Sequence, residues 1–171
     1  MAATGAGRAR GGSHAVASAT PMLAFVAIVS LGSFATALVS QHAFGMEPCP
    51  WCILQRLIFV TIGVLALIGL AIRTATATRI VAALGVLLSL AGIGAALWQQ
   101  FVAAQSASCN LTLADKIVSW TQLDRLLPEA FEARASCADA AVNLLGVPYA
   151  IWSAAAFVIC AVALVRALKV A

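Results

Sequence analysis

The chain has 171 residues, of which 63% are hydrophobic and 9% are charged, and its formal net charge is +4. This balance excludes an ordinary water-soluble domain, because a soluble core cannot bury so large a share of apolar surface. The ten basic residues are scattered between apolar runs, so they form no basic stripe, and we expect no nucleic-acid partner.

The chain opens on a tail, residues 1–20, that is rich in Gly, Ala and Ser and has no apolar period. We predict that this tail is disordered and cytoplasmic. Four apolar runs of about 20 residues follow, each long enough to cross a bilayer. They cover residues 22–42, 51–72, 80–99 and 147–166. The tail and first run could form a cleaved signal peptide, but the run exceeds the usual signal core.

The predicted fold is therefore all-α, a four-helix transmembrane bundle formed by residues 21–171. Two loops connect the helices on the exported side, a short first loop at 43–50 and a long second loop at 100–146. Within the long loop, apolar residues recur at helical spacing from Leu113 to Leu127, which predicts an amphipathic helix. This helix could lie on the membrane surface or form a lid over the bundle, and the sequence favours neither.

The orientation follows from the basic residues that flank the runs. Lys and Arg accumulate in cytoplasmic segments of membrane proteins. They flank the runs at Arg8, Arg10, Arg73, Arg79, Arg166 and Lys169. The pattern predicts that both chain termini are cytoplasmic and that the loops at 43–50 and 100–146 face the exported side.

The five cysteines are distributed unevenly. Cys49 and Cys52 lie in the short exported loop or at its edge, Cys109 and Cys137 lie in the long exported loop, and Cys160 lies within the last run. An exported compartment is oxidising, so two disulfides are expected there. We expect Cys160, which sits among aliphatic residues, to be inert packing.

The Cys-Pro-Trp-Cys sequence opens the second run. Pro50 suits the first position of a helix, which makes Cys49 the predicted N-cap. Cys52 then lies in the first turn, where unpaired N–H groups and the helix dipole stabilise a thiolate. Residues three apart in a helical turn also meet the distance requirement of a disulfide.

Arg56 follows Cys52 by one helical turn and, apart from Arg166 at the very end of the last run, is the only charged residue within the four runs. A cation at this depth costs several kcal/mol, of the order of 3 kcal/mol on insertion scales, unless it is paired or its side chain extends to the interface. Its side chain could simply extend outward. We favour an electrostatic role toward the Cys52 thiolate or, above all, toward a bound electron acceptor.

The run from residue 41 to residue 56, QHAFGMEPCPWCILQR, resembles the DsbB family of bacterial disulfide-bond formation proteins. The resemblance covers about residues 23–168. It also includes Cys109, Cys137, the Leu-Leu-Pro of 126–128 with Phe131, and the segment 144–148 with Trp152.

The resemblance implies a thiol oxidase of the bacterial inner membrane. A reduced periplasmic DsbA-like protein of the thioredoxin fold would attack the Cys109–Cys137 disulfide at Cys109, and the electrons would pass to Cys49–Cys52 and then to membrane quinone, either ubiquinone or menaquinone. Cys49 would meet Cys137 transiently, leaving Cys52 as a thiolate that faces the quinone. Arg56 would stabilise the charge that develops there.

One departure from the family concerns the quinone site. Many members have a histidine near the outward end of the third helix, whereas this chain has Trp98-Gln99-Gln100. A glutamine can hydrogen-bond a quinone oxygen but supplies no titrating proton. We therefore name Gln100 as a candidate for quinone binding beside Arg56. His42 belongs to the matching run, but a histidine at a helix end is more often only solvated.

Three other interpretations remain open. The loops could be joined by two static disulfides without electron flow, although this leaves Arg56 unexplained. Four thiolates could bind zinc, but the oxidising compartment argues against a metal site. A quinone-linked enzyme similar to vitamin K epoxide reductase is the nearest redox rival. That type carries its CxxC on the last helix, where this chain has only Cys160.

Overall fold

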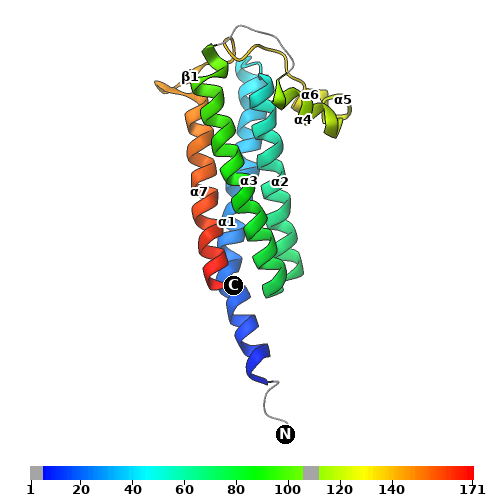
Figure 1. The fold of residues 1–171 in the computed structure, drawn as a ribbon, viewed down its shortest axis with the longest axis vertical. Helices are drawn as coiled ribbons and strands as arrows, with labels where there is room; N and C mark the ends of the chain where they lie inside the picture. The colour runs from blue at the N-terminus through cyan, green and yellow to red at the C-terminus, as the bar shows by residue number, and fades with distance from the viewer. Residues whose placement is uncertain (1–5, 106–111) are drawn as a thin grey trace.

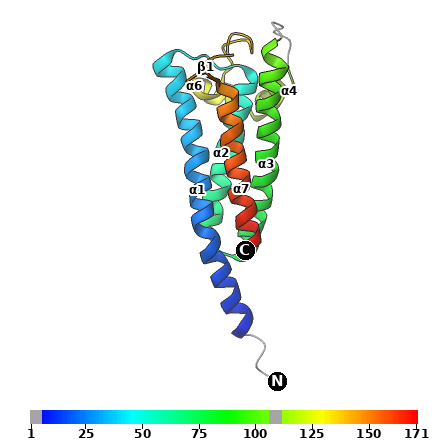
Figure 2. The same ribbon diagram turned by 90° about the vertical axis from the view of Figure 1, so that its left-hand side faces the viewer.

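A bundle of four long helices dominates the computed structural model, which describes residues 6–105 and 112–171. The four are α1 (Ala6–Phe44), α2 (Pro50–Ile72), α3 (Ala75–Phe101) and α7 (Tyr149–Val170). Figures 1 and 2 show them side by side, with the α1–α2 connection and the long α3–α7 connection at the same end. Each contains a stretch long and apolar enough to cross a membrane. This confirms the predicted all-α transmembrane bundle.

The long connection holds the short elements. They are the 3₁₀ helix η1 (Ala103–Gln105), the helices α4 (Leu113–Thr121), α5 (Leu123–Leu126) and α6 (Pro128–Phe131), and the strands β1 (Asn143–Leu144) and β2 (Val147–Pro148). The two strands pair antiparallel, with Leu144 opposite Val147. The two residues between them, Leu145 and Gly146, have φ values of 55° and 80°. Positive φ at both central residues is typical of a tight two-residue hairpin turn.

Helix α1 is longer than predicted. It begins at Ala6, so the expected disorder of residues 1–20 does not hold for the described part of that tail. The segment is rich in alanine, the residue with the highest helix propensity. Pro21, which cannot donate a backbone hydrogen bond, is accommodated inside the helix, and the Thr20 hydroxyl donates to the Val16 carbonyl at 2.8 Å. The apolar span proper starts at Val16, and the preceding turns extend beyond the bundle (Figure 1).

The core lies where the four long helices meet. Phe59 of α2 stacks on Phe157 of α7, with ring centroids 3.9 Å apart and planes 3° from parallel. Gly92 of α3 faces the same Phe157 ring so closely that an added Cβ would lie 2.5 Å from it. The absence of a side chain at Gly92 therefore sets the approach of α3 to α7.

The predicted amphipathic helix is broken and has two apolar faces. It ends at Gln122, whose φ of 56° separates α4 from α5. The buried residues of α4 are Ala114 and Val118, and Val118 packs with Ile53 of α2 and Phe131 of α6. Leu113, Ile117 and Trp120, three of the apolar residues at helical spacing, are exposed. The helix therefore contacts the bundle through one face and leaves a second apolar face open.

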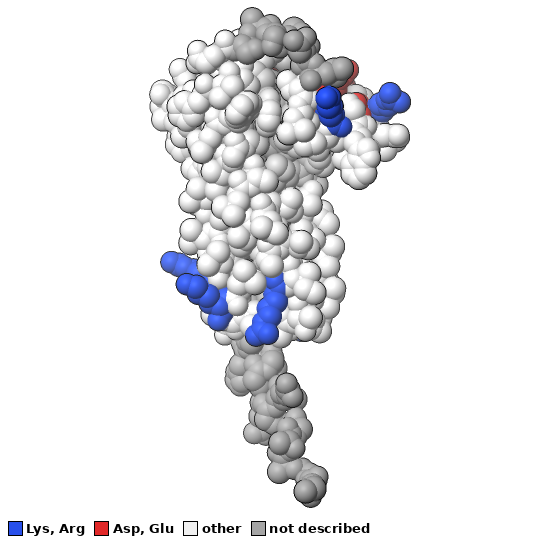
Figure 3. All heavy atoms as spheres, viewed as in Figure 1, with Lys and Arg blue, Asp and Glu red and all other residues white. Residues whose placement is uncertain are grey.

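Charged side chains gather at the two ends of the molecule. The face seen in Figure 3 has basic side chains at the lower end, a broad band without charge, and both signs at the upper end. The lower end carries Arg73, which follows α2, Arg79 in the first turns of α3, and Arg166 and Lys169 in the last turns of α7. All six acidic residues of the chain lie between residues 47 and 139, in the two connections at the upper end. The uncharged band matches the part of the bundle that would lie in lipid.

Candidate active site

The Cys-Pro-Trp-Cys turn opens α2 as predicted. Cys49 is the N-cap, with φ −85° and ψ 168°, and Pro50 occupies the first helical position. The Cys49 sulfur accepts a hydrogen bond from the backbone N–H of Cys52 at 3.4 Å. Both thiols are free, and their Sγ atoms are 2.9 Å apart. The turn therefore holds the two sulfurs where a disulfide can form and open without large backbone motion.

Cys137 reaches the same turn from the long connection. Two consecutive backbone N–H groups, those of Arg134 and Ala135, donate to the carbonyl of Pro48 at 2.9 and 3.2 Å. This tie brings the following residues over the start of α2. The Cys137 sulfur accepts hydrogen bonds from the Cys49 thiol and from the backbone N–H of Trp51. Cys49 thus contacts Cys52 on one side and Cys137 on the other.

The hydrogen bond between Cys49 and Cys137 shifts the pKa values of the two thiols in opposite directions. Cys49 donates, so the bond keeps its proton in place and, with the further effects of Cys52 and burial, raises the pKa of Cys49. The same bond stabilises the thiolate of its acceptor and lowers the pKa of Cys137, although burial opposes the change. Of these two thiols, Cys137 is therefore the better nucleophile.

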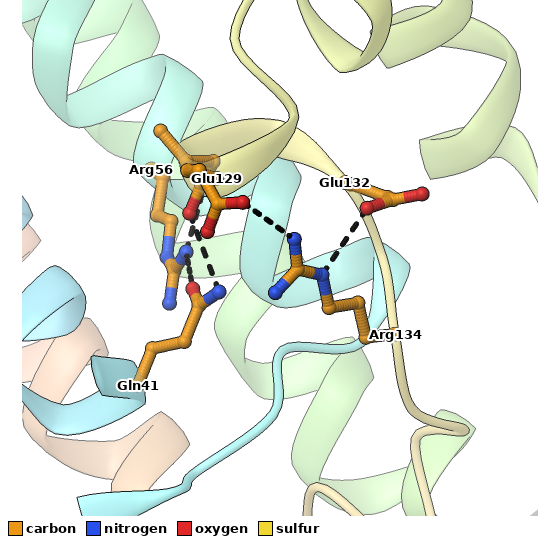
Figure 4. Close-up of polar contacts among 6 residues, drawn as sticks. Gln41, Arg56, Glu129, Glu132 and Arg134 are labelled. Carbon is orange, nitrogen blue, oxygen red and sulfur yellow. Dashed lines mark hydrogen bonds and ion pairs between the residues drawn. The ribbon is translucent and has the colours of Figure 1, made fainter. Parts of the chain in front are cut away.

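Arg56 lies one turn below Cys52, and its side chain is 6% exposed. Its guanidinium donates to Gln41 Oε1 at 2.6 Å, to the carbonyl of Ala130 at 3.0 Å and to the carbonyl of Ala37 at 3.1 Å. Gln41 in turn donates to the carbonyl of Glu129 at 3.3 Å. Figure 4 shows this group between α1 and α6. The side chain does not extend to the interface, and it joins α1, α2 and α6.

A second polar group lies on the other side of Cys52. Gln99 of α3 donates from Nε2 to the Cys52 sulfur at 3.1 Å. Gln55 of α2 donates from Nε2 to Gln99 Oε1 at 2.6 Å. Both glutamines are buried, with exposed fractions of 4% for Gln55 and 5% for Gln99. Two helices therefore supply polar side chains to one sulfur.

A cavity of about 920 Å³ opens beside these groups. Cys52, Gln55, Arg56 and Gln99 line it, together with mostly apolar and small residues of α1 and α7. The two connections at the upper end also line it, and they contribute the charged residues Glu47, Arg134 and Asp139. Tyr149 of α7 also lines it. The volume falls in the range of pockets that hold small organic ligands, about 300–1,000 Å³. The arrangement combines a reactive sulfur, a buried cation and apolar walls.

The structure brings together four of the residues that the sequence named, Cys49, Cys52, Cys137 and Arg56. Cys109 lies outside the described residues. Gln100 does not line the cavity, whereas its neighbour Gln99 does. Cys160 is fully buried within the bundle, 3.5 Å from the Ser30 hydroxyl, as expected for packing. Across residues 6–105 and 112–171, no three His, Cys, Asp or Glu side chains are grouped as metal ligands.

The sequence reasoning missed Gln41, Gln55 and Gln99. A signal for Gln99 exists, because four small residues, spaced three or four positions apart along α3, lead up to it. They are Gly85, Ser89, Gly92 and Ala96, and all four are buried, as is Gln99. This period places Gln99 on the buried face and turns Gln100 away from it.

Comparisons with known proteins identify a family for this chain. The family described as disulfide bond formation protein DsbB matches residues 19–167. The chain is 34% identical over 147 residues to disulfide bond formation protein B of Herminiimonas arsenicoxydans, covering 85% of this chain and 92% of that protein. It is 39% identical over 129 residues to the protein of the same name from Aromatoleum aromaticum, covering 73% and 77%. No solved structure gives a significant match.

Proposed function

Because this chain belongs to the DsbB family of membrane disulfide-forming oxidoreductases, we propose that it reoxidises a soluble periplasmic DsbA-like dithiol protein at the expense of membrane quinone. In this reaction the partner dithiol becomes a disulfide, and the quinone takes up two electrons and two protons. A strongly oxidising partner needs an acceptor of still higher potential, since each 30 mV uphill costs about 1.4 kcal/mol in a two-electron step.

The observation that carries the proposal is the position of Cys49 between Cys52 and Cys137. Because Cys49 contacts both sulfurs, it can exchange its bond from one to the other.

The exchange steps follow from this position. The partner thiolate attacks Cys109, and the partner's second thiol completes its own disulfide, which releases Cys109 and Cys137 in reduced form. Cys137 then attacks Cys49, so that a Cys49–Cys137 bond forms and Cys52 leaves as a thiolate. Cys109 attacks Cys137, restores the loop disulfide and releases Cys49. The dithiol of Cys49 and Cys52 returns to the disulfide as its electrons pass to the quinone.

The cavity fits a quinone head group. Arg56 is a buried cation whose hydrogen bonds end on neutral oxygens, so its charge is available to an anionic neighbour. Arg56 and the Cys52 sulfur line one cavity, and the helices α1 and α7 supply walls suited to an apolar ring and tail. When bound, the quinone would supply the two-electron acceptor. The chain would supply the thiolate, the charge and a site shielded from bulk water.

The distribution of charge supports the membrane orientation that this transfer of electrons needs. We call the transfer, from the partner protein through the two cysteine pairs to quinone, the relay. Arg73, Arg79, Arg166 and Lys169 mark the end that we place in the cytoplasm of a bacterium, together with both chain termini. The Cys49–Cys52 turn and Cys137 lie at the opposite end, which we place in the periplasm. The thiols would then lie on the oxidising side of the inner membrane.

The test is turnover by the purified chain. We expect reduced DsbA-like protein to be oxidised when ubiquinone or menaquinone is added, and we expect the variants Cys52→Ser and Cys109→Ser to lose this turnover. Cys160→Ser is the control, because Cys160 packs inside the bundle away from the turn. Turnover that persists in either of the first two variants would exclude the relay.

A further inference from the structure

Two buried glutamines from different helices form a chain of hydrogen bonds that ends on Cys52. Gln99 Nε2 lies 3.1 Å from the Cys52 sulfur, and Gln55 Nε2 lies 2.6 Å from Gln99 Oε1. Both side chains are at least 95% buried. Burying an amide costs free energy unless its polar atoms are bonded, so a pair of this kind persists only where its bonds are made.

The chemistry of each group fixes the direction of the chain. A thiolate can only accept, so Gln99 must present its NH₂ group to Cys52. Its carbonyl oxygen then points away and requires a donor, which Gln55 supplies. Reversing the Gln55 amide would place two carbonyl oxygens against each other. The orientation of Gln55 therefore determines whether Gln99 can donate to the sulfur.

We propose that Gln99 is a positioning residue that stabilises the thiolate of Cys52 by hydrogen bonding, with Gln55 holding the Gln99 amide in the donating orientation. The proposal rests on the redox role proposed above for Cys52. An amide does not titrate, so this donor is present at every pH, unlike a histidine at the same place. A hydrogen bond to a charged group is also stronger than one between neutral groups, so the pair favours Cys52 as the departing sulfur.

The measurement is the alkylation rate of Cys52 in the reduced full-length protein, in quinone-free detergent, with iodoacetamide and mass spectrometry to separate the cysteines. We expect Gln99→Leu to slow alkylation of Cys52 about tenfold at neutral pH, which corresponds to about 1.4 kcal/mol. The pH profile of the reaction should move to higher pH. Gln100→Leu is the matched control, one residue along α3 and outside the cavity, and should keep the wild-type rate.

Two further variants test the proposed chain. Gln99→Glu preserves the shape of the side chain but replaces the donor with a carboxylate, and it should slow alkylation at least as much as Gln99→Leu. Gln55→Leu should slow alkylation less than Gln99→Leu, and the double variant should be no slower than Gln99→Leu alone, because Gln55 acts through Gln99. Thermal unfolding of each variant in detergent reports whether the fold is intact, and its midpoint should not change.

Wild-type rates at Cys52 in Gln99→Leu and Gln99→Glu would overturn the proposal. Losses that add independently in the double variant would overturn the role of Gln55. Neither quinone nor partner protein is present in this measurement, so its outcome does not depend on the relay. Absence of quinone-dependent turnover in the wild type would overturn the proposed function and leave the hydrogen bond to Cys52 standing.

Discussion

Arg56 is a buried cation without a carboxylate among its hydrogen-bond acceptors. Its guanidinium is satisfied by one amide oxygen and two backbone carbonyls, on Gln41, Ala130 and Ala37. Neutral oxygens solvate the cation but leave its charge uncompensated. A negative charge that develops in the adjoining cavity is therefore stabilised without rearrangement of the protein.

Replacing Arg56 tests this electrostatic role. We expect Arg56→Met to raise the KM for ubiquinone about tenfold or more, because the site loses a charge-assisted contact worth about 1.5–3 kcal/mol. Steady-state oxidation of the partner protein at varied quinone concentration measures the change. Arg79→Met, at the opposite end of the bundle, should leave the KM unchanged. An unchanged KM in Arg56→Met would exclude contact between Arg56 and the quinone.

The pair of Cys49 and Cys137 predicts a pH effect. The hydrogen bond donated by Cys49 lowers the pKa of Cys137, so more of the reactive thiolate is present at neutral pH than for an ordinary thiol. The variant Cys49→Ala removes the donor. Alkylation of Cys137 in the reduced protein should then slow at neutral pH, and its pH profile should move upward. Equal profiles in the two proteins would show that Cys49 does not donate to Cys137.

At the scale of elements, α4 has more apolar surface than one helix face can bury. Ala114 and Val118 pack on the bundle, whereas Leu113 and Trp120 are 63% and 86% exposed. The break at Gln122 lets α5 and α6 turn back toward α2, which brings Phe131 to Val118. An exposed apolar face at the end of a membrane bundle is suited to the lipid interface, where Trp is enriched.

The inner face of α4 determines whether the long connection stays docked. Val118→Asp places a charge against Ile53 and Phe131, and we expect the connection to detach. Trypsin should then cut faster after Lys116, Arg125 and Arg134 in the detergent-solubilised protein. Trp120→Asp, two residues along on the exposed side, should keep the wild-type cleavage rate. Equal cleavage of both variants would show that Val118 does not hold the helix.

The long helices were predictable because their signal is continuous hydrophobicity over a membrane thickness. The rotational position of each helix about its own axis was harder to predict, because consecutive residues differ by about 100° around that axis. Gln99 and Gln100 illustrate the consequence, because only the packing of α3 determines which amide meets Cys52. The extension of α1 to Ala6 was missed because a weakly polar, alanine-rich segment is compatible with both helix and coil.

At the scale of the whole molecule, the bundle depends on the close approach of α3 and α7. We expect Gly92→Ala to destabilise the protein by about 1–3 kcal/mol, since the new Cβ would overlap the Phe157 ring. Gly94→Ala is the matched control, because nothing lies within 4 Å of its added Cβ. Unfolding in mixed detergent micelles compares the two variants. Equal stability would show that Phe157 moves aside without cost.

Composition and the spacing of the cysteines were sufficient to predict a membrane bundle with thiols at one end. They were not sufficient to predict the contacts of Arg56, whose acceptors are 15, 19 and 74 residues away from it in the chain. Such contacts depend on how the long connection folds back over the helices. No local pattern in the sequence specifies that path, because α5 and α6 are only four residues long.

The contact between Arg56 and the Ala130 carbonyl links two events that are separate in the covalent chemistry. If the long connection is detached from the bundle, as expected for Val118→Asp, the guanidinium loses an oxygen neighbour, and an ionised sulfur nearby becomes a stronger stabilising neighbour for its charge. Detachment of the loop and ionisation of Cys52 therefore favour each other by the same free energy, whichever comes first. A variant that favours either detachment or ionisation should therefore favour the other as well.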